Sequence, residues 1–158
     1  MSAEVITGRF GDGHKARGEG PYSLPESAKI GLPILDQAHM SLLAHLNAAH
    51  AALVAGDDAK ARLQLETLRS EMATHFDIEE QIMQALGLPA LRDHVRQHAT
   101  KEAQVDGICR ASLARGALTI GDIDQCFQLL IDEVVRGDLE LKSHFQSMGC
   151  APIHQRGA

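Results

Sequence analysis

The sequence predicts an all-α protein: an antiparallel up-down-up-down four-helix bundle with an irregular N-terminal arm. Beyond residue 32, apolar residues recur at intervals of three and four through four long segments, and no segment shows the strict alternation of a half-buried strand. Short stretches with glycine or proline separate these segments, as in bundles whose consecutive helices run antiparallel. The 158 residues suffice for one domain with a sizeable core.

The two ends of the chain differ from this pattern. Residues 1–32 carry glycine and proline at short intervals and no sustained apolar period, so we expect an arm that either covers the bundle or is disordered. The bundle is expected at residues 33–150, and a short tail at residues 151–158.

The first two helices have clear start and stop signals. The first is expected at about residues 35–54 and ends at Gly56. Asp57 or Asp58 then provides the N-cap of a second helix, which glycine and proline close after about residue 86.

The third helix is expected at about residues 89–115 and ends at Gly116. Thr119 and Asp122 have the spacing of a capping box, with Asp in place of Glu or Gln, and begin a fourth helix that runs to about residue 148. Gly137 lies inside this helix, where it costs about 1 kcal/mol relative to alanine, and so indicates a bend or a close approach.

Charge and composition exclude several classes of protein. The formal net charge of −6 argues against nucleic-acid binding, which needs a basic surface. No apolar run is long enough to span a membrane, and residues 1–25 lack the apolar stretch of a signal peptide. The three cysteines fit neither a disulfide framework nor a CxxC zinc site, so a cytoplasmic location is the simplest expectation.

The informative polar residues lie on the apolar stripes of the predicted helices. Each helix directs at least one of the nine histidines inward, and the second adds a carboxylate. This set is His39, His75, Glu79, His94, His98 and His144. Side chains four apart on a helix are neighbours, so His75 with Glu79, and His94 with His98, can each share a metal centre.

A single inward histidine is more often a hydrogen-bonded core residue than a ligand. Five buried imidazoles and a carboxylate, however, are costly to satisfy without metal, so the set predicts a metal site. Imidazole and carboxylate suit iron, zinc or copper, and the lack of a cysteine in the set argues against structural zinc. By contrast, Glu80 is expected on an outward face of the second helix, as solvated charge.

Four motifs in this order resemble those of the hemerythrin family. Residues 30–39, IGLPILDQAH, resemble the family's opening motif, whose last residue is a ligand histidine. Residues 75–83, HFDIEEQIM, match its HFxxEExxM pattern, and residues 94–98 match its HxxxH helix. Residues 141–144, LKSH, resemble its last motif.

The resemblance implies a bundle that holds two non-heme iron ions joined by an oxo or hydroxo bridge. It assigns His94, His98 and His144 to one iron, and His39 and His75 to the other. The same resemblance makes Glu79 a bridge between the two irons and leaves positions open for dioxygen or another small ligand.

Three positions depart from the family pattern. The family's last motif is HxxxxD, but the residue five after His144 is Gly149, so the second bridging carboxylate is missing there. Glu140 stands where the family usually has tryptophan, and Lys101 where it usually has phenylalanine. We therefore expect Glu140 to supply the missing carboxylate, with Lys101 as its charge partner. The alternative is an ion pair between Glu140 and Lys101 at the edge of the bundle, with solvent as the second bridge.

Three functions follow from these expectations. The first is a di-iron protein that binds dioxygen, nitric oxide or peroxide for oxygen binding, sensing or redox response. The second is a di-iron peroxidase or oxidase with an atypical site, and the third is an iron- or zinc-storage bundle. No nucleic acid or membrane is an expected partner, and a sensor would need a separate signalling or redox partner.

Overall fold

The computed structural model describes residues 20–148. The tail expected at residues 151–158, and also Gly149, lie outside the described residues. Within the described part the regular secondary structure is entirely helical, with no strand. Its main elements are α1 (Pro33–Val54), α2 (Asp58–Ala85), α3 (Leu91–Arg115), α4 (Ile120–Asp132) and α5 (Leu139–Ser147).

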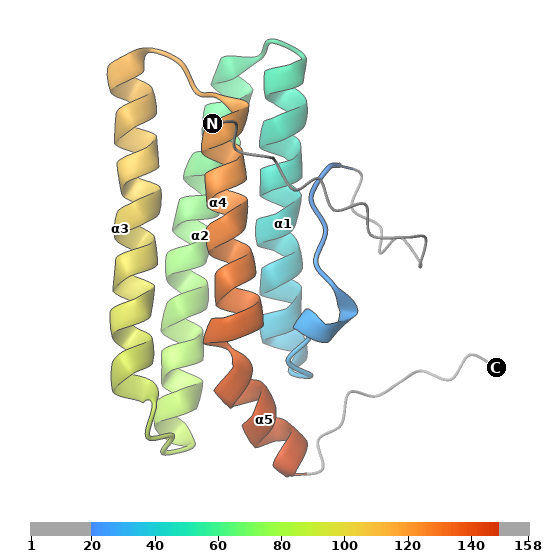
Figure 1. The fold of residues 1–158 in the computed structure, drawn as a ribbon, viewed down its shortest axis with the longest axis vertical. Coiled ribbons are helices and arrows are strands. Elements are labelled where there is room, and N and C mark those ends of the chain that lie inside the picture. The colour runs from blue at the N-terminus through green and yellow to red at the C-terminus, as the bar shows by residue number, and fades with distance from the viewer. Residues whose placement is uncertain (1–19, 149–158) are drawn as a thin grey trace, which may run out of the picture.

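Helices α1 to α4 form an antiparallel bundle, and short connections join them at alternating ends (Figure 1). This confirms the predicted fold class. The helix boundaries follow from local signals in the sequence. Gly56 adopts a φ of 78° where α1 turns into α2, and the side chain of Asp57 accepts a hydrogen bond from the backbone N–H of Lys60. Thr119 and Asp122 form the expected capping box at the start of α4.

The predicted fourth helix is not continuous to residue 148. Instead, α4 ends at Asp132, and a single π-helical turn, η2 (Glu133–Gly137), follows it. The backbone N–H of Asp138 donates to the carbonyl of Glu133 at 3.0 Å, an i to i+5 hydrogen bond. Beyond this turn α5 diverges from the axis of α4 (Figure 1), so the chain does bend at the predicted glycine, Gly137.

The described part of the arm packs against the bundle. The ring of Tyr22 is buried 4.6 Å from that of Phe127, measured between centroids, and its hydroxyl donates to Asp124 at 2.5 Å. A short 3₁₀ turn, η1 (Glu26–Ala28), contacts η2, and the ammonium of Lys142 donates to the carbonyl of Ser27. The arm thus runs beside the lower part of α1 (Figure 1) and covers the region where α4 gives way to α5.

Two apolar clusters form the core and leave a polar layer between them. On α2, Met72 and Phe76 belong to the larger cluster, whereas Met83 belongs to the smaller one together with Leu35 and Leu141. His75 and Glu79 lie between these methionines in the chain and are fully buried. The interior of the bundle therefore has a polar centre at this level.

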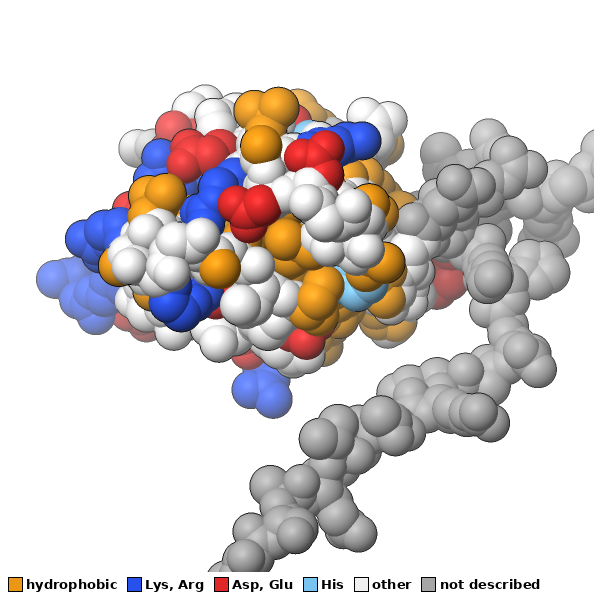
Figure 2. All heavy atoms as spheres, turned by 90° about the horizontal axis from the view of Figure 1, so that it is seen from above, with side chains coloured by type: hydrophobic (Ala, Val, Ile, Leu, Met, Phe, Trp, Pro, Cys, Tyr) orange, Lys and Arg blue, Asp and Glu red, His pale blue; other side chains and the backbone are white. Residues whose placement is uncertain are grey.

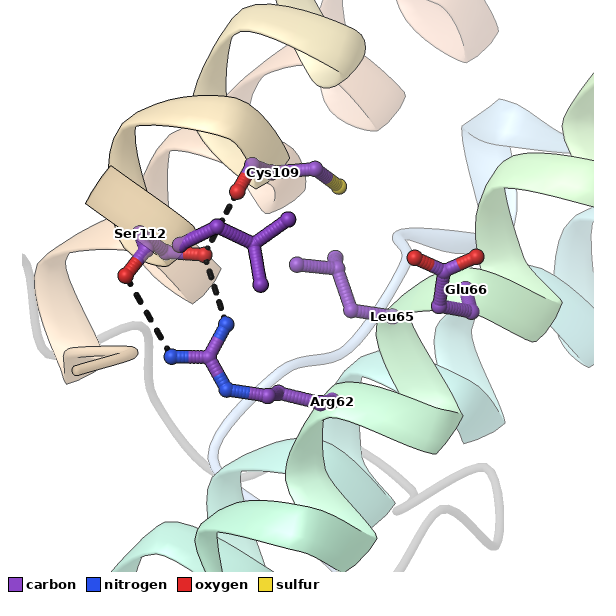
Figure 3. A pocket seen from close by; sticks show the side chains of 6 residues that line it. Arg62, Leu65, Glu66, Cys109 and Ser112 are labelled. Atoms are coloured by element: carbon purple, nitrogen blue, oxygen red, sulfur yellow. Dashed lines mark hydrogen bonds between the residues drawn. The ribbon is translucent and has the colours of Figure 1, made fainter. Parts of the chain in front are cut away.

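The opposite end of the bundle has a structural contact between α2 and α3. The guanidinium of Arg62 donates to the hydroxyl and the carbonyl of Ser112, beside a cavity of about 40 Å³ that Cys109 also lines (Figure 3).

Seen from that end, Lys and Arg side chains gather on the side of α3, among interspersed acidic and apolar side chains (Figure 2). None of the helices in the described residues is long and apolar enough to cross a bilayer.

Candidate metal centre

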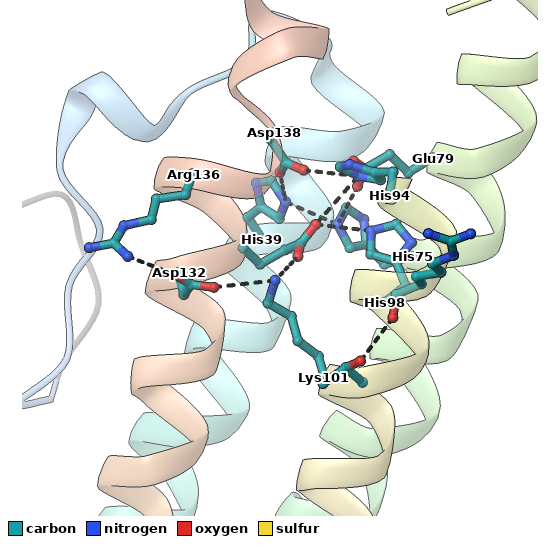
Figure 4. Close-up of polar contacts among 12 residues, drawn as sticks. His39, His75, Glu79, His94, His98, Lys101, Asp132, Arg136 and Asp138 are labelled. Atoms are coloured by element: carbon teal, nitrogen blue, oxygen red, sulfur yellow. Dashed lines mark hydrogen bonds and ion pairs between the residues drawn. The ribbon is translucent and has the colours of Figure 1, made fainter. Parts of the chain in front are cut away.

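Seven buried side chains meet in the polar layer of the bundle and form two adjacent groups (Figure 4). In each group, one potential ligand atom per residue lies within 4.8 Å of every other. One group contains His39, His75 and Asp138. The other contains Glu79, His94, His98 and Glu133.

Regular helix geometry brings most of these side chains together. His75 and Glu79 are one turn apart on α2, and His94 and His98 are one turn apart on α3, so each pair shares a face. His39 from α1 completes the histidine set, with its Nε2 3.0 Å from Nε2 of His75. These five residues were all predicted to point inward.

Glu79 faces both groups at once. Its Oε1 lies 2.5 Å from Nε2 of His94, and its Oε2 lies 3.2 Å from Nε2 of His75. The carboxylate therefore extends between the α1–α2 histidines and the α3 histidines.

Asp138 does the same from the start of α5. Its Oδ2 lies 3.2 Å from Nε2 of His39, and its Oδ1 lies 3.8 Å from Nε2 of His94. Two carboxylates, from Glu79 and Asp138, thus each present one oxygen to each histidine group. This arrangement suits a pair of metal ions bridged by two carboxylates.

Glu133 adds a third carboxylate on the side of α3. Its Oε1 lies 3.0 Å from Nε2 of His98 and 3.6 Å from Nε2 of His94. The other oxygen, Oε2, forms an ion pair with the buried ammonium of Lys101 at 2.8 Å.

The π-helical turn explains how Glu133 and Asp138 reach the same centre. Residues five apart on an α-helix point about 140° away from each other, because each residue advances the helix by about 100°. In η2 the hydrogen bond spans five residues instead of four, so the two carboxylates face the same side. Gly137 leaves room for this turn, since a Cβ there would lie 2.9 Å from Oε2 of Glu133.

The ring of His98 is held from two further sides. Its Nδ1 lies 2.7 Å from Oε1 of Glu80, and the ring stacks on Phe76 with centroids 3.8 Å apart. A carboxylate on the second ring nitrogen orients a metal-binding imidazole and fixes its tautomer. Glu80, which was expected to be solvated, therefore supports the site.

The pKa values in the centre reflect burial and crowding of charge. Burial, together with the neighbouring His75, lowers the pKa of His39 to about 4, so this imidazole is neutral and can bind metal. Burial opposes ionisation of Glu133, but His98 and Lys101 outweigh it and lower the pKa of this carboxyl to about 2. Burial and the adjacent carboxylates raise the pKa of Asp138 well above its usual value.

The structure passes a direct test of whether these residues suit metal ions. Among the described residues, Oε2 of Glu79 and both carboxylate oxygens of Asp138 are buried without a hydrogen-bond partner. Buried polar atoms of this kind are costly unless something satisfies them. Three carboxylates and four imidazoles face one another here, with Lys101 as the accompanying cation, so the donor set fits two multivalent cations.

Comparison with known proteins adds one positive finding. The model of the hemerythrin HHE cation binding domain matches residues 31–144. The chain belongs to the hemerythrin family. A comparison with curated proteins gave no match. Membership of this family, together with the His and carboxylate groups, establishes the chain as a metal-binding protein.

The hemerythrin pattern also clarifies the fourth helix. Glu133 and Asp138 have the spacing of the family's HxxxxD motif, with glutamate in place of histidine. The second carboxylate that the sequence analysis found missing at Gly149 therefore has a counterpart at Asp138, five residues after Glu133. Only the histidine of the motif is replaced.

Glu140 and His144 are not part of either group within residues 20–148. The side chain of Glu140 is exposed and, with Arg136 and Ser143, lines an open pocket of about 440 Å³ whose wall includes His94. His144 is half-buried on α5. These positions depart from the expectation that both residues bind metal, because the π-helical turn shifts every later residue relative to a continuous α-helix.

Sequence reasoning missed Glu133 and Asp138 as site residues. One available signal was their five-residue spacing, which equals that of HxxxxD. A second was that Glu133 follows the buried Leu130 by three residues and so lies on the inward face of α4. Glutamate in place of the motif's histidine obscures both signals.

Proposed function

We propose that this hemerythrin-family chain holds two non-heme iron ions and binds dioxygen or a related small ligand, such as nitric oxide or peroxide. The observation that carries this proposal is the placement of two carboxylates: Glu79 and Asp138 each present one oxygen to one histidine group and the other oxygen to the other group. The nitrogen and oxygen donors, without a thiolate, suit iron. When bound, the iron pair supplies reversible electron transfer to an oxygen-containing ligand.

The donors are unequally distributed between the two positions. In our assignment, His94, His98 and Glu133 serve one ion and His39 and His75 serve the other. Glu79 and Asp138 contact both histidine groups and are assigned to both ions. The ion beside His39 therefore has one protein donor fewer, which leaves a position for a small ligand. A shortage of protein donors is typical of metal sites that bind exogenous ligands.

The space beside His39 favours a small ligand. A cavity of about 50 Å³ lies between the arm and α1, and its lining combines apolar residues with charged ones: Leu24, Pro25, Ala28, Met40, Glu26, Lys29, Asp36 and His39 itself. Such a volume admits a diatomic molecule or one water but excludes larger substrates. The arm thus limits the access of solvent on this side of the centre.

Metal analysis joined to an absorption spectrum tests the proposal. Protein from iron-replete cells should contain two irons per chain, and the anaerobically reduced protein should develop a visible charge-transfer band on exposure to air. Zinc without iron in such protein would refute the di-iron proposal and favour the storage or zinc-binding alternative.

A di-iron peroxidase or oxidase is the second candidate. The open pocket that reaches His94 favours it, because Arg136, Glu140 and Gln97 give this pocket a polar lining suited to hydrogen peroxide. Peroxide turnover by the iron-loaded protein, compared with the zinc-loaded protein, separates this candidate from a ligand-binding role. Turnover no faster than that of the zinc-loaded control would remove it.

A further inference from the structure

Lys101 is a buried cation in direct contact with the candidate metal centre. Lys101 lies on α3, about one helical turn after His98. Its side chain is only 6% exposed. The ammonium lies 2.8 Å from Oε2 of Glu133 and 3.4 Å from Oδ2 of Asp132. Glu133 is itself 2% exposed, so this ion pair is shielded from solvent.

Both partners of this ion pair are departures from the hemerythrin pattern. Glu133 stands at the histidine of HxxxxD, and Lys101 stands where the family usually has phenylalanine. The two positions lie on different helices, 32 residues apart, yet their side chains form the closest charged contact that either makes. A pair of separate substitutions has therefore produced one interaction.

The charges of the two departures cancel. Replacing a neutral imidazole with a carboxylate adds one negative charge to a buried site that already holds Glu79 and Asp138. Replacing phenylalanine with lysine adds one positive charge beside the new carboxylate. Either change alone would leave an uncompensated buried charge, which is strongly destabilising, whereas the two together satisfy each other.

The ion pair also determines which oxygen of Glu133 faces the centre. Lys101 engages Oε2, and Oε1 is left 3.0 Å from Nε2 of His98. Gly137 provides the space on the third side of the carboxylate, where a Cβ would lie 2.9 Å from Oε2. Among residues 20–148, Lys101 is the cation that pairs with Oε2.

We propose that Lys101 and Glu133 act as a coupled replacement, in which Lys101 is a positioning residue that orients Glu133 as a metal ligand and keeps the charge of the centre equal to that of a histidine-containing site. The inference rests on the proposed di-iron function. It extends that function by assigning Lys101 a role in metal binding.

Four proteins test the coupling: the wild type, Lys101→Met, Glu133→His and the double variant. Anaerobic Fe²⁺ binding is measured by competition with a chelator, and the Co²⁺ absorption spectrum reports the ligand set. Each single variant should bind the weaker of the two ions about 10- to 100-fold less tightly, as loss of a residue that supports a ligand commonly does. The double variant should bind both ions more tightly than either single variant.

Lys60→Met is the matched control, because Lys60 is exposed near the start of α2, at the far end of the bundle. It should bind Fe²⁺ as the wild type does. Far-UV circular dichroism establishes that each variant is folded. If Lys101→Met alone does not fold, the comparison of Glu133→His with the double variant still decides, since the coupling requires the double variant to be the tighter binder.

The outcomes separate the two proposals. A wild-type chain that does not bind two ions overturns both. If the wild type binds two ions, but Lys101→Met leaves the Fe²⁺ affinity and the Co²⁺ spectrum unchanged, the coupling is wrong and the di-iron proposal stands. Effects of the single variants that simply multiply in the double variant would likewise overturn the coupling.

Discussion

Gly137 provides a sharp test of how the centre is built. In Gly137→Ala the new Cβ would lie 2.9 Å from Oε2 of Glu133 and 3.1 Å from its Cδ, whereas ordinary contacts begin at 3.4 Å. The carboxylate must therefore move by about 0.5 Å, against a 2.8 Å ion pair with Lys101 and a 3.0 Å contact with His98. Such strain costs about 1–3 kcal/mol.

Alanine also gains helix propensity over glycine, by about 1 kcal/mol. The two effects nearly offset each other, so we expect metal-free Gly137→Ala to lose no more than about 2 kcal/mol of unfolding free energy. Displacement of the carboxylate, however, should weaken Fe²⁺ binding by about 10- to 100-fold. Urea denaturation of the metal-free protein and Fe²⁺ competition with a chelator measure the two effects separately.

Gly107→Ala is the matched control. Gly107 lies within α3, has an ordinary helical φ, and a Cβ there would meet nothing within 4 Å. This variant should gain about 0.5–1 kcal/mol of stability and bind Fe²⁺ unchanged. If Gly137→Ala behaves in the same way, Glu133 is not held where the structure places it, and the reasoning about the centre is refuted.

Three further predictions follow from the contacts described above. Asp138→Asn should reduce the iron content below two per chain, whereas Glu140→Gln, at an exposed position, should leave the iron content unchanged. Elemental analysis measures both, and the reverse result would make Glu140 the ligand. The unfolded chain protonates His39 near pH 6.5 but the folded chain only near pH 4, so His39 should contribute about 3 kcal/mol of metal-free stability above pH 6.5 that is lost as the pH drops to 4. The raised pKa of Asp138 acts in the opposite sense in this range, so the urea midpoint of the wild type is compared with that of His39→Gln at each pH, and parallel profiles contradict the prediction. Tyr22→Phe should lose about 1 kcal/mol with its hydrogen bond to Asp124, and an unchanged urea midpoint would contradict that.

The sequence was sufficient to predict the bundle and most of the polar centre. His39, His75, Glu79, His94 and His98 lie on regular α-helical faces, so counting by three and four residues finds them. The same counting fails for Glu133 and Asp138, which share a face only because η2 is a π-helical turn. Counting by three and four residues does not record a π turn, so the five-residue HxxxxD spacing was the one local signal that could have indicated it.

The roles of individual charges were harder to predict than their positions. Lys101 was expected to accompany a carboxylate at the metal site, and it does contact one, but the partner is Glu133 instead of Glu140. Glu80 was expected in solvent because its helix face points outward from the α2 stripe. The neighbouring α3 brings Nδ1 of His98 to it, and this contact depends on the packing of two helices.

The π-helical turn amounts to a single extra residue in an otherwise α-helical segment. Deleting one residue, such as Val135, would leave Asp138 four residues after Glu133 in a regular helix, where the two carboxylates would still share a face. Such a chain would still form its bundle, because helices α1 to α3 and most of α4 do not depend on the turn. The turn therefore lets this stretch hold one residue more than a regular helix would, without moving the carboxylates at its two ends away from the same face.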